Sequence, residues 1–280
     1  MAYRRARAAV YRVQTNLYAK SFSPDRNLLP VQTRSQPLTG YMIAVYRARN
    51  AAYVERLVRE AEETGLRVGL WALDTIVPSL QSVTLGSGQG ARSDLLTTLD
   101  QRMRESAESF VLVADDDFEF VRGTLASFLQ LSVKCGFMLS QPAHIPSSNS
   151  SYGFNRCRPW FTARATTFVE CGPIFLVHPR FHSRIFPMPE GFGMGWGLEL
   201  RWFSSLLPTE RFGIVDSVWI THHGIIGADY HGFQSEVNRL DHELHGLEIS
   251  DIRKICKTTS VWRRHRPIPA NWALTKGTVG

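Results

Sequence analysis

The sequence predicts an α/β fold in which a mostly parallel β-sheet is flanked by helices, and two observations carry that prediction. Residues 110–114 form an uninterrupted apolar run, which is typical of a short strand buried on both faces in the middle of a parallel sheet. Residues 40–73 read as a strand, a helix and a second strand. The two strands of such a unit are parallel and joined by a right-handed crossover.

The first strand–helix–strand unit has recognisable boundaries. Residues 41–46 have the composition of a strand, residues 51–63 can form a helix with Gly65 as its stop, and residues 67–73 form the second strand. Asp74 ends that strand, where a carboxylate could accept hydrogen bonds from a nucleoside base or ribose. A helix N-cap is the alternative role for Asp74.

Three consecutive carboxylates, Asp115, Asp116 and Asp117, follow the central apolar strand directly. Ligands in open α/β sheets bind at the carboxyl ends of such strands, and adjacent carboxylates repel one another unless a cation or hydrogen-bond donors hold their charge. Oxygen ligands favour Mg²⁺ or Mn²⁺, and Mg²⁺ is usually shared with substrate phosphates. The sequence therefore indicates a divalent-cation site, with a solvated acidic loop as the alternative.

A glycine-rich segment at residues 85–94 precedes the acidic strand. Glycine-rich loops let backbone N–H groups approach a phosphate, and Arg92 lies within this one. The segment matches no established nucleotide-binding motif, so a plain flexible loop is the alternative. Residues 93–108 have helical composition and lead back to the acids.

The segments beyond the acids are predicted from composition and length. Residues 122–134 are expected to form a helix and residues 136–142 a strand. Residues 143–160 are rich in Pro, Ser and Asn and long for a connection, which predicts a flexible or substrate-covering loop. Residues 166–177 are strand-like and interrupted by a Gly-Pro step.

Glycines alternate with aromatic residues at positions 190–198, which predicts a loop that approaches a ligand and offers a face for a sugar ring. Glu199 then opens a helix over residues 200–207. A carboxylate beside such a loop is a candidate general base for a hydroxyl nucleophile. The alternative is a glutamate that complements the dipole of the helix start.

A predicted strand at residues 213–221 ends in two histidines, His222 and His223. Imidazole suits Mn²⁺ and other transition metals. Adjacent side chains on a strand point in opposite directions, so at most one of the two is expected to face the acids. Residues 230–247 read as a polar surface helix.

Composition and charge limit the class of protein. The 280 residues are 44% hydrophobic and 20% charged, with a net charge of +7, which is ordinary for a globular protein. No nucleic-acid-binding module is recognised, so nucleic acid is not expected as a partner. The N-terminus lacks a signal-peptide core, and four widely spaced cysteines indicate a reducing compartment. We therefore expect a cytoplasmic protein.

We expect the chain to divide into a basic N-terminal arm at residues 1–39, one folded domain at residues 40–265 and a loose tail at residues 266–280. A short basic helix in the arm could contact a membrane surface peripherally. A solvated extension is the alternative. No apolar run approaches the length of about eighteen residues that crosses a bilayer.

Six segments together resemble the domain-of-unknown-function family numbered seven hundred and seven, whose plant and bacterial members are regarded as glycosyltransferases of the GT-A fold. The resemblance spans roughly residues 70–225 and holds in order and spacing. It rests on residues 114–117, 139–143, 162–164, 169–175, 195–199 and 214–219. It implies a Rossmann-type, GT-A-like catalytic domain, and a metal-dependent enzyme that moves a sugar from a nucleotide-diphosphate donor to an acceptor hydroxyl.

The resemblance also implies roles for individual residues. Asp117 would be the main ligand of Mn²⁺ or Mg²⁺, Asp115 would support the metal or the ribose in the manner of a DxD motif, and His222 would complete the metal site. The three residues expected to bind the donor are Asp74, Arg92 and Asp116. The donor is expected to be a UDP- or GDP-sugar.

On the acceptor side, Glu199 would take the proton of the hydroxyl, although the family usually has aspartate at this position. Gln141, Gly195 and Trp196 are expected to contact the acceptor, a glycan or a small molecule. One such base fits inversion at the anomeric carbon. Two alternatives remain: another phosphate-handling metalloenzyme, such as a nucleotidyltransferase, or a catalytically silent relative that binds carbohydrate or nucleotide.

Overall fold

The computed structural model describes residues 38–190, 192–224 and 252–263, with a few isolated residues between 238 and 246. Almost all of the predicted basic arm, the predicted polar helix at residues 230–247 and the predicted C-terminal tail lie outside the described residues. Among the described residues, no helix has the length and apolar character needed to cross a membrane.

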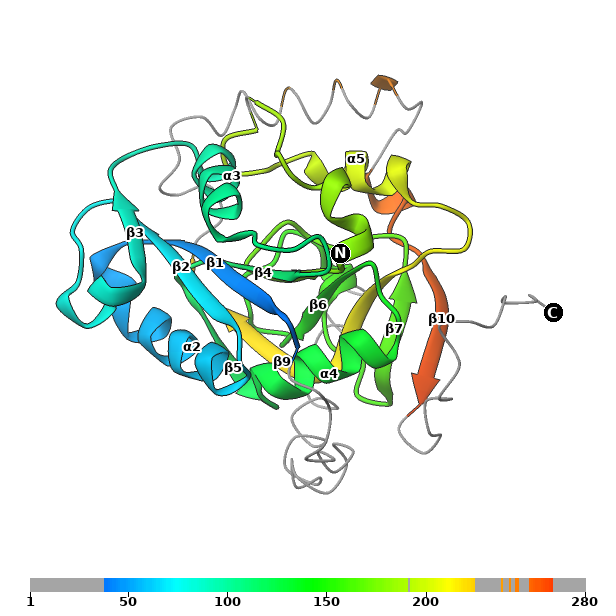
Figure 1. Ribbon diagram of the computed structural model, residues 1–280. Coiled ribbons are helices and arrows are strands. Elements are labelled where there is room, and N and C mark those ends of the chain that lie inside the picture. Colours follow the sequence, from blue (N-terminus) through cyan, green and yellow to red (C-terminus); the bar gives the residue numbers. More distant parts are fainter. Residues whose placement is uncertain are drawn as a thin grey trace.

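A single mixed β-sheet forms the centre of the described part of the chain (Figure 1). Its spatial order is β3-β2-β1-β4-β8-β6-β9-β7-β10, with β5 paired to β9. All of these strands run in one direction except β5, β7 and β8, so the predicted mostly parallel sheet is confirmed. The strands are β1 (Gly40–Tyr46), β2 (Arg67–Ala72), β3 (Thr84–Ser87), β4 (Phe110–Ala114), β5 (Phe118–Arg122), β6 (Leu139–His144), β7 (Phe161–Thr166), β8 (Ile174–Val177), β9 (Phe212–His222) and β10 (Thr258–Arg263).

Helices cover both faces of the sheet (Figure 1). Helices α2 (Ala51–Glu63) and α4 (Leu125–Lys134) lie on one face, and α3 (Arg92–Met103) and α5 (Leu198–Ser205) lie on the other. Because successive side chains of a strand point to opposite faces, β1 feeds two cores. One core contains Met42, Ala44 and Tyr46, and the other contains Tyr41, Ile43 and Val45.

Short 3-10 helices occur in the connections between these elements. In the described part of the chain they are η2 (Ala48–Asn50), η3 (Pro78–Val83), η4 (Gly153–Asn155), η5 (Pro179–Arg184) and η6 (Ile252–Lys254).

The first strand–helix–strand unit and the central strand are where the sequence predicts them. Helix α2 has the predicted bounds, and Gly65 adopts a φ of 82° directly after it, a left-handed conformation that glycine reaches without strain. Strand β4 is buried along almost its whole length and lies between β1 and β8. The carboxyl ends of β1, β2 and β4 therefore lie together at one edge of the sheet, as predicted.

The glycine-rich segment is different from the prediction, because part of it is the edge strand β3. Gly86 lies against the ring of Trp71 on β2, and a Cβ at this position would come 2.3 Å from a ring carbon. The indole nitrogen of Trp71 also donates to the carbonyl oxygen of Gly88 at 2.9 Å. At least at Gly86, the glycine is explained by tryptophan packing and requires no phosphate.

Three other expectations about secondary structure are corrected. The helix expected at residues 122–134 begins at Leu125, because residues 118–122 form strand β5, an aromatic and β-branched run that pairs with the end of β9. Helix α3 ends at Met103, earlier than predicted. The strand-like segment at residues 166–177 has a longer interruption than predicted, because β7 ends at Thr166 and β8 begins at Ile174.

Candidate active site

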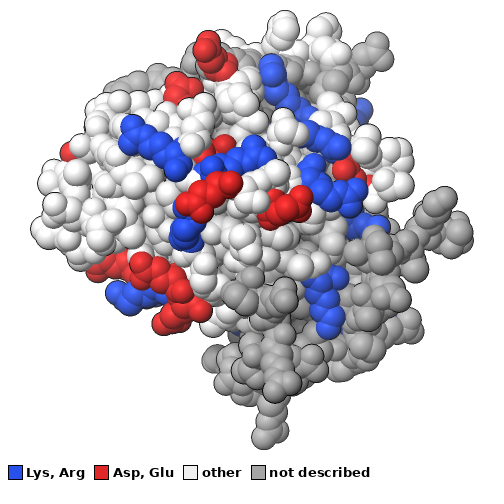
Figure 2. All heavy atoms as spheres, in the orientation of Figure 1, with Lys and Arg blue, Asp and Glu red and all other residues white. Residues whose placement is uncertain are grey.

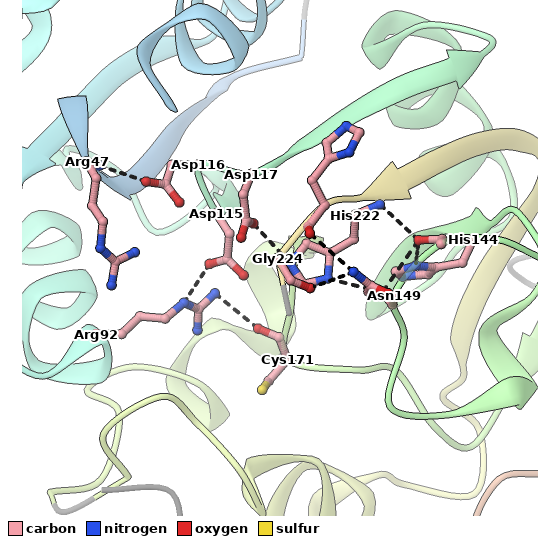
Figure 3. A network of polar contacts seen from close by, with 12 residues as sticks. Arg47, Arg92, Asp115, Asp116, Asp117, His144, Asn149, Cys171, His222 and Gly224 are labelled. Atoms are coloured by element: carbon pink, nitrogen blue, oxygen red, sulfur yellow. Dashed lines mark hydrogen bonds and ion pairs between the residues drawn. The ribbon is translucent and has the colours of Figure 1, made fainter. Parts of the chain in front are cut away.

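Three acids follow β4, and their side chains point toward partners on three different elements (Figure 3). Two of the partners stand at the ends of strands that run parallel to β4: Arg47 follows β1 and His222 ends β9. The third, Arg92, is the first residue of α3. The pairs are Asp115 with Arg92, Asp116 with the backbone of Arg47, and Asp117 with His222.

Asp117 and His222 are brought together by the pairing of β5 with β9. Phe118, the first residue of β5, is opposite His222 in the register. The backbone N–H of His223 also donates to the carbonyl oxygen of Asp117 at 2.8 Å. The unexpected strand β5 is therefore the element that places the third acid beside the histidine.

The hydrogen bonds of His222 define its chemistry. Its Nε2 lies 3.0 Å from Asp117 Oδ1, and its Nδ1 lies 3.1 Å from the carbonyl oxygen of Asn149. A carbonyl oxygen only accepts, so Nδ1 carries the proton that points at Asn149. Nε2 must then carry a second proton or share a cation with the carboxylate. Burial lowers the pKa of His222, but the Asp117 and Asp115 carboxylates outweigh burial and raise it to about 9.

These two donor atoms suit a divalent cation that is shared with a phosphate. A separation of 3.0 Å matches neighbouring positions around an octahedral cation with bonds of about 2.1 Å, and Asp117 Oδ1 is buried without a well-directed hydrogen bond. Among the residues that the structure describes, no three His, Cys, Asp or Glu side chains gather as a metal cage. Mg²⁺ typically takes one or two carboxylates and fills its other positions with water and phosphate oxygens. The pair fits such a partial site.

His223 points away from the acids, as the alternation of a strand requires. Its ring stacks on Tyr53 with the centroids 5.0 Å apart, and its Nε2 lies 3.1 Å from Glu119 Oε1. Of the two histidines, His222 is therefore the one that faces the acids.

Arg92 is committed to protein acceptors. Its Nε donates to Asp115 Oδ1 at 2.6 Å and its Nη2 to the carbonyl oxygen of Cys171 at 3.1 Å, and the residue is 7% exposed. Gly172 lies against the same carboxylate, because a Cβ there would come 2.7 Å from Asp115 Oδ2. Asp115 is thus held from two sides. The predicted phosphate contact of Arg92 stays a prediction.

Asp116 and Asp74 both accept backbone N–H groups of the turn that follows β1. Asp116 Oδ2 accepts the N–H of Arg47 at 2.7 Å, and Asp74 Oδ1 accepts the N–H of Ala48 at 2.9 Å. The hydrogen bond from Ala48 lowers the pKa of Asp74. Burial raises the pKa of Asp116 to about 6. In this structure the two acids shape the turn, and their predicted contacts with the donor are not tested.

Glu199 is 4% exposed and lies in the first turn of α5. Its two oxygens accept the backbone N–H groups of Cys171 at 3.2 Å and Gly197 at 3.1 Å. Burial raises its pKa to about 7. The carboxyl group therefore exchanges its proton near neutral pH, as a general base requires. The bond from Gly197 also gives it the helix-start role that the sequence left open.

The three expected acceptor contacts are in different environments. Gln141 is 1% exposed and accepts the N–H of Glu170 through Oε1 at 2.6 Å. Gly195 adopts a φ of 105° close to Cys171 and Arg92. Trp196 is half-buried in the loop before α5. Gly195 and Trp196 belong to the loop that leads into α5 and Glu199, whereas Gln141 lies on β6.

The segment at residues 143–160 is pinned rather than loose, which corrects the expectation of a flexible loop. Glu170 accepts the N–H of Ser151 at 3.1 Å and the side chain of Asn155 at 2.5 Å. Asp216 accepts the N–H of Arg158 at 2.7 Å and pairs with Arg164 at 2.8 Å. The buried carboxylates of Glu170 and Asp216 thus accept hydrogen bonds from N–H groups of the loop that would otherwise need water as a partner.

Sequence reasoning missed two residues, Arg47 and Glu170. Arg47 follows β1 directly, at the strand edge where the acids lie, and that position was a usable signal. Glu170 is an acid within an apolar stretch, which is the pattern of a buried and fully bonded carboxylate.

Charges of both signs are mixed on the face shown in Figure 2. There, Lys and Arg side chains of the described residues lie among Asp and Glu side chains and do not form one continuous basic surface. None of the four cysteines, all of which the structure describes, is in a disulfide: Cys135, Cys157 and Cys171 are buried and Cys256 is half-buried.

The fold is that of the GT-A glycosyltransferases. The structure of GalNAc-T7 with UDP, GalNAc and Mn²⁺ matches with a TM-score of 0.54 and 11% sequence identity over 82% of this chain. Residues 1–349 of S. aureus TarS, in complex with UDP-GlcNAc, match with a TM-score of 0.51 and 11% identity over 77% of this chain and 69% of that one. The chain spans about half the length of the GalNAc-T7 chain, 53% of which is covered.

Sequence comparison adds no closer relative. No family model matches the chain, and no curated protein matches it in sequence. The resemblance to the family numbered seven hundred and seven is therefore not confirmed, and at 11% identity the structural likeness shows the fold alone.

Proposed function

We propose that the protein is a metal-dependent glycosyltransferase that moves a sugar from a nucleotide-diphosphate donor to an acceptor hydroxyl. The observation that carries the proposal is the pair of Asp117 and His222 at the carboxyl edge of a GT-A sheet. The Nδ1 atom of His222 bonds the carbonyl oxygen of Asn149, so Nε2 is the nitrogen that faces the Asp117 carboxylate. The structures that share the fold contain UDP, a UDP-sugar or Mn²⁺.

In this proposal Asp117 and His222 would hold Mn²⁺ or Mg²⁺, and Asp115 would support the metal or the ribose. The bound cation would supply positive charge for the departing diphosphate. Arg92 and Gly172 hold the Asp115 carboxylate in one orientation. Because the Asp115 carboxylate is already oriented, it has to move little when the nucleotide-sugar binds.

Glu199 takes the proton of the acceptor hydroxyl as that hydroxyl attacks the anomeric carbon. Its carboxyl group is oriented by two backbone N–H groups, and its raised pKa lets it exist as a carboxylate at neutral pH and still accept a proton. One base on the face opposite the leaving group fits inversion. Trp196, in the neighbouring loop, would offer its ring to the sugar.

Release of nucleotide diphosphate from a panel of UDP- and GDP-sugars tests this function. Glycosyltransferases also transfer slowly to water, so the assay needs no known acceptor. We expect release from one donor with Mn²⁺, at least a hundredfold less release from Asp117→Ala, and full release from the matched control Asp94→Ala on the exposed side of α3. Turnover without metal, or turnover unaffected by Asp117→Ala, would overturn the proposal.

A further inference from the structure

Arg47 has a guanidinium group beside the acids for which the described residues supply no hydrogen bond or ion pair. We propose that this group, and not that of Arg92, contacts the diphosphate of the nucleotide. The inference rests on the donor site proposed above and assigns its cationic contact to a residue that the motifs do not contain.

Arg92 has few hydrogen-bond donors left to give. It is 7% exposed, and its Nε and Nη2 already donate to Asp115 and to the carbonyl oxygen of Cys171, with Nη1 3.5 Å from the carbonyl oxygen of Met194. Turning Arg92 toward a phosphate would leave these buried acceptors without partners, which is costly. Its structural work is to hold Asp115 and to join α3 to the loop before α5.

Arg47 differs from Arg92 because its backbone, and not its guanidinium, bonds to a neighbouring acid. Its backbone N–H is tied to Asp116 at 2.7 Å, so the position of the residue is fixed at the end of β1. Its side chain is half-buried, and the guanidinium makes no hydrogen bond or ion pair with any residue that the structure describes. A guanidinium has five N–H donors. This arginine is positioned by its backbone while its side-chain donors stay available.

The guanidinium of Arg47 also lies within electrostatic reach of the proposed metal pair. The backbone of Arg47 is bonded to Asp116, the residue directly before Asp117. In Figure 3 the side chain extends past the Asp116 carboxylate, on the side where Asp115 and Arg92 lie. Its charge therefore faces the edge at which a diphosphate would be held.

The chemistry of a diphosphate explains why a second cation is needed there. A divalent cation neutralises only part of the negative charge of a nucleoside diphosphate. When the bond to the sugar breaks, the terminal phosphate gains further negative charge. Arginine binds phosphate with two parallel N–H···O bonds, which adds orientation to charge. Arg47 would thus favour a diphosphate over a nucleoside or a monophosphate.

Calorimetric titration with uridine, UMP and UDP in the presence of Mn²⁺, or with guanosine, GMP and GDP if UDP does not bind, tests the assignment. UDP is the probe because it is present in a structure that shares the fold. Wild type is compared with Arg47→Ala, Arg47→Lys and Arg59→Ala. Arg59 is the matched control, because it is exposed on α2 and its removal changes the net charge equally. Thermal unfolding of each variant checks that it folds.

We expect Arg47→Ala to weaken UDP binding by about ten- to a hundredfold, the worth of a charged hydrogen bond, while uridine binding stays within about twofold. Arg47→Lys should fall between, and Arg59→Ala should match wild type. Equal UDP affinity in wild type and Arg47→Ala would overturn the inference while leaving the donor site standing. If wild type bound none of the three probes nor GDP, the proposed function and this inference would both fail.

Discussion

Glu199→Gln tests whether the candidate base is held where ionisation is unfavourable. The side chain is 4% exposed, and burial raises its pKa from an ordinary 4.5 to about 7. Between these values the native state keeps a proton that the unfolded chain releases. The free energy of unfolding therefore falls as the pH rises from about 4.5 to 7. At about 1.36 kcal/mol for each pH unit, the interval corresponds to a loss of about 3 kcal/mol.

Glutamine cannot ionise, so the variant escapes this loss. Its amide oxygen replaces only one of the two acceptors used by Cys171 and Gly197, at a cost of about 1–3 kcal/mol at every pH. The test is the change with pH of the difference in free energy of unfolding between Glu199→Gln and wild type. We expect Glu199→Gln to gain about 3 kcal/mol relative to wild type between pH 4.5 and pH 8.

Urea denaturation of both proteins across this range measures the difference directly. The control is Glu62→Gln, which changes an exposed glutamate on α2 and should leave the difference flat. A constant difference between Glu199→Gln and wild type would show that Glu199 ionises as it does in the unfolded chain. The role of general base near neutral pH would then lose its physical basis.

Two further predictions concern the support of the site. Asp216→Ala should destabilise the protein by about 3–5 kcal/mol in urea denaturation, because it leaves the buried guanidinium of Arg164 without its charge partner. Adding Arg164→Met should recover part of that loss, and a fully additive double variant would contradict the pairing. Gly172→Ala should push Asp115 aside and weaken UDP binding about tenfold or more, since a Cβ would lie 2.7 Å from the carboxylate. Unchanged affinity for UDP would show that the position of Asp115 does not matter.

The sequence predicts the elements whose signals are local. The apolar run of β4, the acids that follow it, and helix α2 with Gly65 at its end are where composition and turn chemistry indicate. The ends of parallel strands meet at one edge whatever the loops do. The edge of the sheet that carries the acids was therefore predictable from the sequence, whereas strand β5, which pairs with β9 and places Asp117 beside His222, was not.

The features that the sequence did not reveal depend on contacts between distant residues. Gly86 lies in a glycine-rich segment that suggests a phosphate loop, and it packs against the ring of Trp71 on the next strand. The phosphate contact of Arg92 stays a prediction, and the sequence did not show that its side chain donates to Asp115 and to the carbonyl oxygen of Cys171. Sequence spacing shows which side chains are charged, and it does not show which of them already have partners.

The loop at residues 143–160 was misjudged for the same reason. Its Pro, Ser and Asn content is typical of a mobile segment. Glu170 and Asp216, which lie later in the chain, satisfy its backbone and side-chain donors and fix its course. Composition alone gives no access to such long-range acceptors.

The most direct test of the central claim is calorimetric titration with UDP and GDP, with and without Mn²⁺, on wild type and Asp117→Ala. The account predicts that one nucleotide binds wild type only when Mn²⁺ is present, because Asp117 and His222 form a partial site that the diphosphate completes. Asp117→Ala should abolish this metal-dependent binding without unfolding the protein. Nucleotide binding that is equal with and without metal, or no binding of either nucleotide, would contradict the claim.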